Sequence, residues 1–236
     1  MPPRLRLLPA VLLVVLLLGA CNRREDRVHE QQFIAFGTLI SVTLYDVEEQ
    51  AAQRAFTTLE QSFNQMHRDW HAWEAGPLVD LNRALAARGE TDVPPAILPL
   101  LAPAQRLARA SSGLFDPAIG GLLALWGFHS DDLPQHAPTA GAVAAQVAQH
   151  ASVTDLLLNG SRLRTSNPAV QLDFGGLAKG YAAQRGAQQL QALGIDNALI
   201  AVAGDIRALG QRGERAWRIG IRHPRAAGVL AATDLA

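Results

Sequence analysis

Apolar and polar positions in the chain fall into runs that predict two β-hairpins. Residues 32–36 and 39–45 are mostly apolar or β-branched, and a Gly-Thr pair separates them. Two such runs around a glycine-containing break predict a hairpin or a bulged pair of strands. Residues 153–158 and 161–165 form a similar pair around Asn-Gly, a sequence that favours a two-residue hairpin turn.

Other segments show the three- and four-residue spacing of an amphipathic helix. The clearest one carries apolar side chains from Ala52 to Met66 and is predicted to end near residue 67. Asp46 and Glu49 precede it with the spacing of a capping box. Similar patterns predict further helices over residues 78–87, 94–112, 139–149 and 178–193, and a shorter apolar helix after Asp116-Pro117.

Extended apolar runs at 197–203 and 217–222, the first followed by a Gly-Asp turn, complete the set of predicted strands. Strands and helices therefore alternate irregularly along the chain, with several hairpins. This order favours an α+β fold with a mixed, largely antiparallel sheet and flanking helices. Residues 31–236 show no internal repeat and no linker, and we expect them to form one domain.

One stretch suggests a phosphate site. An apolar extended run over residues 170–174 leads through a glycine pair into a predicted helix. Asp173 lies where this run ends, and Lys179 lies in the first helical turn. A helix start presents free N–H groups and the positive end of the helix dipole, so a carboxylate and an ammonium beside it indicate nucleotide chemistry. Glycines at such turns also serve tight packing alone, and the spacing matches neither a Walker loop nor a Rossmann fingerprint.

Composition and charge narrow the function classes. The 236 residues are 18% charged and 49% hydrophobic, their formal net charge is zero, and no basic cluster alternates with aromatic residues. We therefore expect no binding to nucleic acid. Cys21 is the only cysteine, which excludes an internal disulfide and a cysteine metal cluster. The sequence contains no Gly-x-Ser-x-Gly elbow, so no hydrolase-type nucleophile is predicted and the catalytic residues stay unassigned.

The N-terminus predicts export and lipidation. Residues 1–20 have a basic start and an apolar run too short to span a bilayer comfortably, which is the pattern of a secretory signal peptide. The run ends in Leu-Gly-Ala before Cys21 and resembles a bacterial lipobox. We expect lipid on Cys21 to attach the chain to a membrane, with the polar segment 21–30 as a tether.

Three other sites have a structural and a functional interpretation. Asp116, ahead of an apolar helix, is a helix cap or a ligand contact. His67 and His71 have the spacing of a metal pair on a helix, but their segment is predicted to be a loop without a third ligand nearby, which disfavours a metal. Asp205, after a glycine, forms a simple turn or shares a polar pocket with Asp173.

Several motifs, taken together and in this order, resemble the ApbE family of FAD:protein FMN transferases. Two blocks are specific: Phe-Asp-Pro followed by Leu-Trp-Gly-Phe within residues 113–128, and Asp-x-Gly-Gly-x-Ala-Lys-Gly-Tyr at 173–181. The signal peptide and the lipobox also fit, since many members are lipoproteins that face the periplasm. The remaining matches are Phe36-Gly37-Thr38 with the strand to residue 45, Leu81-Asn82, residues 197–209 and residues 217–224.

The resemblance implies an activity, its cofactors and its partners. Members of the family cleave FAD at its pyrophosphate with the help of Mg²⁺, transfer FMN to a Thr or Ser hydroxyl of a target protein, and release AMP. Such phosphoryl transfer depends on positioning the pyrophosphate and neutralising its charge. The partners are then FAD and an acceptor protein. The alternatives are a non-catalytic FAD-binding lipoprotein and an FAD pyrophosphatase.

The resemblance also assigns site residues. Gly176 falls where the family supplies a magnesium ligand and would offer its backbone carbonyl, a hard oxygen that suits Mg²⁺. Phe36 stands where many members have methionine, and Trp73, or else Trp70, replaces a tyrosine beside the flavin; these side chains are large enough to stack on a ring. The expected FAD contacts are Phe36, Trp73, Leu114, Phe115, Asp116, Asp173 and Lys179.

The extent and the location of the protein follow from the same resemblance. The family normally continues with a Ser-Gly-Asp-Tyr segment, a His-x-x-Asp-Pro segment, and a late Asp and Thr that complete the magnesium site. We therefore expect the domain at 31–236 to lack its usual C-terminal part. The lipobox implies a membrane-anchored lipoprotein facing the periplasm, and Asn22 after the cysteine leaves the inner and the outer membrane both open.

Overall fold

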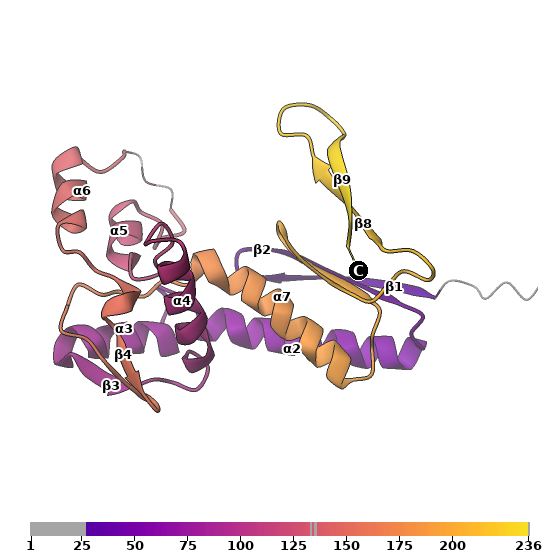
Figure 1. Ribbon diagram of the computed structural model, residues 1–236, viewed down its shortest axis with the longest axis horizontal. Helices are drawn as coiled ribbons and strands as arrows, with labels where there is room; N and C mark the ends of the chain where they lie inside the picture. The colour runs from indigo at the N-terminus through magenta and orange to yellow at the C-terminus, as the bar shows by residue number, and fades with distance from the viewer. Residues whose placement is uncertain (1–26, 133, 135, 236) are drawn as a thin grey trace, which may run out of the picture.

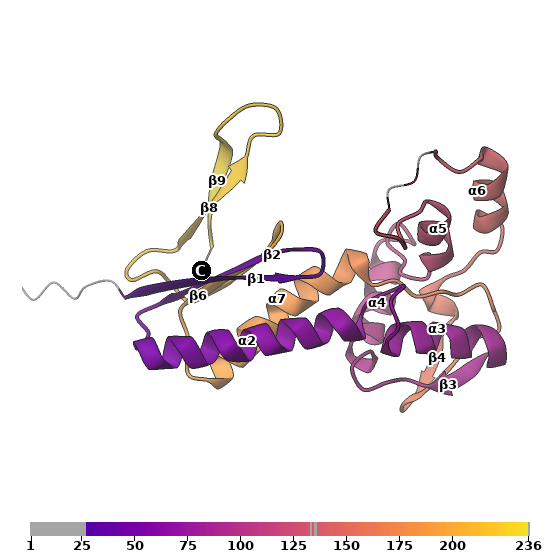
Figure 2. The ribbon, with the colours of Figure 1, turned by 180° about the vertical axis from the view of Figure 1, so that it is seen from behind.

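The computed structural model describes residues 27–132, 134 and 136–235 (Figure 1). The predicted signal peptide, Cys21 and the first part of the tether lie outside the described residues. A four-stranded sheet with two long helices forms one end of the molecule, and shorter helices and strands form the other (Figures 1 and 2). The prediction of an α+β fold with flanking helices is confirmed. Among the described residues, no helix is both long and apolar enough to cross a membrane.

The four-stranded sheet has the order β1-β2-β6-β7, and each neighbouring pair is antiparallel. In β2 the alternate residues Ile40, Val42 and Leu44 are fully buried in the core that the sheet forms with α2 and α7. The hairpin predicted around residue 37 and the turn before Asp205 are both confirmed. These elements are β1 (Val28–Ala35), β2 (Thr38–Tyr45), α2 (Glu49–Asp69), α7 (Gly175–Ala192), β6 (Ala198–Val202) and β7 (Asp205–Leu209).

At the other end, backbone bonds bring two distant segments to the start of α7. The Asp173 N–H donates to the Pro117 carbonyl and the Gly120 N–H donates to the Gln171 carbonyl, both at 2.8 Å. The hairpin around Asn-Gly is confirmed as β4–β5. The remaining elements of this end are α3 (Pro77–Arg88), β3 (Glu90–Asp92), α4 (Leu98–Ala110), α5 (Gly120–Leu125), α6 (Ala140–Val147), the 3-10 turn η2 (Val153–Asp155), β4 (Leu157–Asn159) and β5 (Arg162–Arg164). The hairpin of β8 (Trp217–Arg222) and β9 (Val229–Leu235) lies instead beside the four-stranded sheet (Figures 1 and 2).

The predicted limits of α2 are wrong at both ends. The helix has Glu48 as its N-cap without a side-chain capping bond, so Asp46 and Glu49 form no capping box. Asp46 instead takes a left-handed backbone (φ 55°), and its N–H donates to the carbonyl of Arg27 at the end of the sheet (2.8 Å). Since α2 continues to Asp69, His67 lies on a helix and not in a loop.

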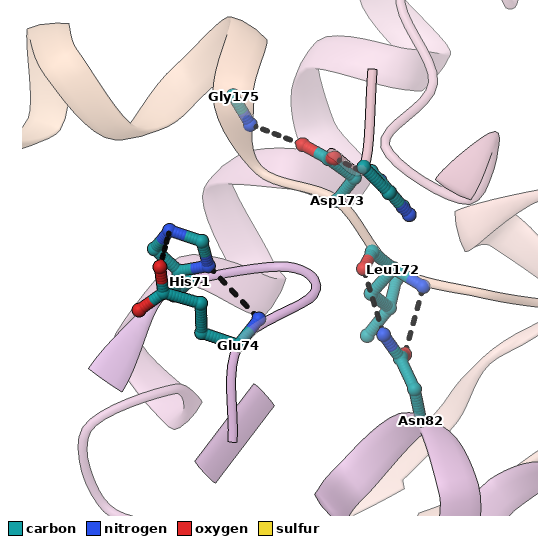
Figure 3. Close-up of polar contacts among 7 residues, drawn as sticks. His71, Glu74, Asn82, Leu172, Asp173 and Gly175 are labelled. Atoms are coloured by element: carbon teal, nitrogen blue, oxygen red, sulfur yellow. Dashed lines mark hydrogen bonds and ion pairs between the residues drawn. The ribbon is translucent and has the colours of Figure 1, made fainter. Parts of the chain in front are cut away.

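The strand predicted over residues 170–174 is also wrong, because a side chain replaces the partner strand. Gln171 makes an isolated parallel bridge to Ile119. Asn82, buried on α3, donates its amide N–H to the Leu172 carbonyl and accepts the Leu172 N–H, both at 2.8 Å (Figure 3). A side-chain amide thus makes the hydrogen bonds that these buried backbone groups would otherwise make to a neighbouring strand. This pairing fixes the backbone just before residue 173.

Candidate functional site

A cavity of about 410 Å³ lies where the β1–β2 turn, the end of α2, the loop after α2 and the start of α7 meet. Four residues predicted to contact FAD line it, although they come from separate parts of the sequence: Phe36, Trp73, Asp173 and Lys179. The volume is within the range of small-molecule sites. The other predicted residues, Leu114, Phe115, Asp116 and Gly176, are not among its lining residues.

One wall of the cavity is aromatic and begins at the β1–β2 turn. Phe36 has φ 54° and Gly37 has φ 65°, as a two-residue turn of type I′ requires. A bulky residue in this backbone region is uncommon, so it needs support. The Phe36 N–H donates to Nδ1 of His67 (3.2 Å), and its ring stacks on Trp70 with centroids 6.0 Å apart. The turn therefore holds an aromatic ring at the cavity.

Both candidate tryptophans line the cavity, and Trp73 is the more exposed of the two. Trp70 is only 9% exposed, and its indole N–H donates to the carbonyl of Ala96 (2.9 Å). Trp73 is 41% exposed. Its ring meets His71 edge-on at 4.3 Å between centroids and stacks on His129 at 5.3 Å. The geometry therefore favours Trp73 over Trp70 as the side chain beside a flavin.

Asp173 is held by two donors at the start of α7 (Figure 3). Its Oδ1 accepts the N–H of Gly175 (2.7 Å), and its Oδ2 lies 2.9 Å from Nε2 of His129. The helix dipole stabilises a carboxylate in this place. One of the N–H groups that were predicted to bind a phosphate, that of Gly175, therefore already donates to a carboxylate of the chain itself. Lys179, the only lysine in the sequence, lies one turn further along α7 and lines the same cavity.

Asp116 has a structural role in the described residues. Its Oδ1 accepts the N–H groups of Ala118 and Val153 at 2.9 Å each, and its Oδ2 accepts the hydroxyl of Ser152 at 2.6 Å. Asp116 therefore caps a short turn ahead of α5 and fastens η2, where the sequence predicted a strand. A carboxylate with three donors keeps little capacity for a ligand. Its contact with FAD stays a prediction.

Phe115 and Gly176 lie together at the start of α7, next to Gly175, which lines the cavity. A Cβ added to Gly176 would come within 3.2 Å of the Phe115 ring, so this ring packs on the first turn of α7. Leu114, the neighbour of Phe115, is 94% exposed. The structure thus brings the segment with these two residues to the start of α7, and their contact with FAD remains a prediction.

The described residues do not form a metal site by themselves. No three of their His, Cys, Asp or Glu side chains are placed to hold one ion. The rings of His67 and His71 are 5.3 Å apart, but Nδ1 of each accepts a backbone N–H. The donor to His67 is Phe36, and the donor to His71 is Glu74 (Figure 3). Gly176 can offer Mg²⁺ one carbonyl oxygen, whereas the ion requires an octahedral oxygen shell.

Sequence reasoning missed three polar residues at this site. Glu74 and Asp131 line the cavity, and His129 contacts Asp173. His129 directly follows the Leu-Trp-Gly-Phe block, which is the one signal that could have identified it. Nothing in the sequence connects it to residue 173, which is 44 positions away.

The protonation of His67 is coupled to the β1–β2 turn. Burial lowers the pKa of His67 below its ordinary value of 6.5, and the neighbouring His71 lowers it further. Because the folded pKa is depressed, the unfolded chain binds this proton first as the pH falls. The contribution of neutral His67 to stability is therefore present above about pH 6.5 and is lost as the pH falls through the folded pKa.

The variant His67→Asn tests this coupling, because it keeps an acceptor for the Phe36 N–H and does not titrate. We expect its free energy of unfolding, from urea titrations between about pH 8 and about pH 5, to fall less steeply than that of the wild type. One proton accounts for at most about 1.4 kcal/mol per pH unit. His136→Asn changes an exposed histidine and should keep the wild-type slope. Equal slopes for the wild type and His67→Asn would contradict the coupling.

Comparison with known proteins relates these features to a family. The model of the ApbE family matches residues 36–236. An FAD:protein FMN transferase of Rhodobacter capsulatus is 43% identical over 205 residues, which are 87% of this chain and 39% of that protein. One from Klebsiella pneumoniae is 26% identical over 202 residues, 85% of this chain and 60% of that protein. The chain thus spans less than two thirds of the length of these relatives.

Solved structures have the same fold. The apo form of Pseudomonas stutzeri flavinyl transferase ApbE matches with a TM-score of 0.78 and 26% identity, over 91% of this chain and 68% of that one. The ApbE protein of Thermotoga maritima matches with a TM-score of 0.80 and 23% identity, over 89% and 68% of the two chains. With the family model covering most of the sequence, this chain belongs to the ApbE family.

Proposed function

We propose that the chain binds FAD in this cavity and transfers its FMN part to a Thr or Ser hydroxyl of a target protein, with release of AMP. Relatives in the family carry the name FAD:protein FMN transferase. The observation that carries the proposal is that Phe36, Trp73, Asp173 and Lys179 meet in one cavity. Each of these side chains has chemistry that suits one part of FAD.

The cavity offers an aromatic wall and one lysine, Lys179, which lines it together with the carboxylates of Glu74, Asp131 and Asp173. The rings of Phe36 and Trp73 suit the flat isoalloxazine, which gains from offset or edge contacts with aromatic side chains. The Lys179 ammonium and the positive end of the α7 dipole suit the pyrophosphate. Asp173 would repel a phosphate, so it is suited to accept a hydrogen bond from a nucleotide hydroxyl or ring N–H on its remaining lone pairs.

The proposed transfer is a substitution at phosphorus. The acceptor hydroxyl oxygen bonds to the phosphorus of the FMN half, the P–O bond to the AMP half breaks, AMP leaves with the electron pair, and a base takes the hydroxyl proton. The cavity residues contribute by holding the pyrophosphate in line with the hydroxyl. Magnesium belongs to the proposal through the family resemblance and would neutralise phosphate charge.

Two alternatives use the same cavity. If the chain binds FAD without chemistry, it is a flavin-binding lipoprotein. If water replaces the acceptor hydroxyl, it is an FAD pyrophosphatase that forms FMN and AMP. The products formed separate the three functions.

Incubation of the chain with FAD, Mg²⁺ and a threonine-containing acceptor domain tests the proposal, with the acceptor mass and released AMP as readouts. We expect the mass to increase by one FMN group with one AMP per acceptor. Trp73→Ala should slow the transfer about 5-fold at FAD concentrations below saturation, because a stacking surface worth on the order of 1 kcal/mol is lost. Leu193→Ala, which removes a similarly exposed side chain at the end of α7, should keep the wild-type rate.

Other products would change the assignment. AMP without an acceptor adduct would indicate the pyrophosphatase, and bound FAD without AMP would indicate the binding protein. A chain that retains no FAD would contradict the proposal as a whole.

We further propose that the chain is a membrane-anchored lipoprotein that faces the periplasm. The support is the basic start, the apolar run and the Leu-Gly-Ala-Cys sequence at residues 18–21. More than one lipid chain is needed for stable anchoring. Cells fed an alkyne fatty acid should incorporate label into the wild-type chain and not into Cys21→Ser. Label in both proteins, or in neither, would count against lipidation at this cysteine.

A further inference from the structure

His129 touches two ligand-facing groups of the cavity without being one of its lining residues. Its Nε2 lies 2.9 Å from Oδ2 of Asp173, and its ring stacks on Trp73 with centroids 5.3 Å apart and planes 19° apart. The side chains of His129 and Asp173 are each 9% exposed. One nearly buried imidazole therefore contacts both the carboxylate and the indole that line the cavity.

The contact with Asp173 fixes the direction of its carboxylate. An ionised carboxylate only accepts hydrogen bonds, so His129 must carry a proton on Nε2. With the Gly175 N–H on Oδ1 and His129 on Oδ2, both oxygens are held and the carboxylate plane is set. Each oxygen still has a lone pair for a ligand. If the His129 donor is lost, the carboxylate can turn about the Gly175 contact.

The contact with Trp73 fixes the plane of the indole. Trp73 lies in the loop between α2 and α3, where an exposed ring would otherwise sample several rotamers. The near-parallel imidazole of His129 supports one face, and His71 meets the ring edge-on. A ring that is already ordered loses less conformational entropy when a flat ligand stacks on it.

We propose that His129 is a positioning residue of this site, which sets Asp173 and Trp73 together in the orientation that receives a flavin nucleotide. The proposal rests on the proposed function. It assigns His129 an effect on orientation and not on stability. The physical reason is that replacing both partners of a buried hydrogen bond by apolar groups of the same shape is often nearly neutral for stability, so stability alone explains the pair poorly.

Two variants separate the two contacts. His129→Phe keeps a ring for Trp73 and removes the donor, whereas His129→Gln keeps a donor for Asp173 and removes the ring. We expect His129→Phe to raise the dissociation constant of FAD about 10- to 100-fold, the loss typical of a hydrogen bond to a charged group. His129→Gln should raise it about 2- to 10-fold and lessen the quenching of bound-flavin fluorescence by the indole. His136→Phe, an exposed control, should bind like the wild type.

A double-mutant cycle distinguishes positioning from a general structural role. If His129 acts through Asp173, His129→Phe should change FAD binding by less than about 2-fold once Asp173→Asn is present. The proposal is overturned if the loss is undiminished in that background. It is also overturned if both His129 variants weaken binding equally and in proportion to their loss of unfolding free energy.

The imidazole ¹⁵N spectrum of the FAD-free chain tests the contact between His129 and Asp173 independently of FAD binding. We expect the His129 signal, identified by its absence in His129→Gln, to show a proton on Nε2 in the wild type and to shift in Asp173→Asn. If the wild type fails to bind FAD, the proposed function is wrong, and this spectrum still decides whether the pair exists. An identical His129 signal in the two proteins would overturn the proposal.

Discussion

The site depends on one buried amide. Asn82 on α3 pairs with both backbone groups of Leu172, and the next residue is Asp173. Since the segment 170–174 has an isolated bridge in place of a ladder, its course past the start of α7 relies on this pairing and on the bond from Asp173 to Pro117. Removal of the amide would leave two buried peptide groups unpaired, at a cost of about 1–3 kcal/mol each.

Charged and aromatic side chains beside this backbone segment line the cavity. The carboxylate of Asp173 is held at the positive end of α7, and Lys179 follows one turn later. Of the 21 lysine and arginine residues in the sequence, only residue 179 is a lysine, and it lies at the candidate site. Lysine is a compact point charge on a flexible stem, whereas arginine presents a planar fork. A compact charge suits a phosphate that approaches beside a helix terminus.

The sequence predicted the elements whose signals are local. Alternation and turn chemistry identified the hairpins, and three- and four-residue spacing identified α2. The extended segment 170–174 has the composition of a strand, but the partner of Leu172 is a side chain 90 positions away, which no local pattern shows. The family resemblance identified Trp73, and the local pattern around the glycine pair identified Asp173. His129, which contacts both, was missed because only the tertiary structure brings it there.

Protection of Lys179 by FAD tests most directly whether the cavity at the start of α7 is a flavin nucleotide site. In the unlipidated chain from Asn22 onward, an amine-reactive acylating reagent has two targets, Lys179 and the α-amino group, and mass spectrometry of peptides gives the rate at each. We expect saturating FAD to slow the acylation of Lys179 and to leave the α-amino group unaffected, while adenosine, which lacks the pyrophosphate and the flavin, protects neither. Acylation of Lys179 at the same rate with and without FAD would contradict this assignment of the cavity.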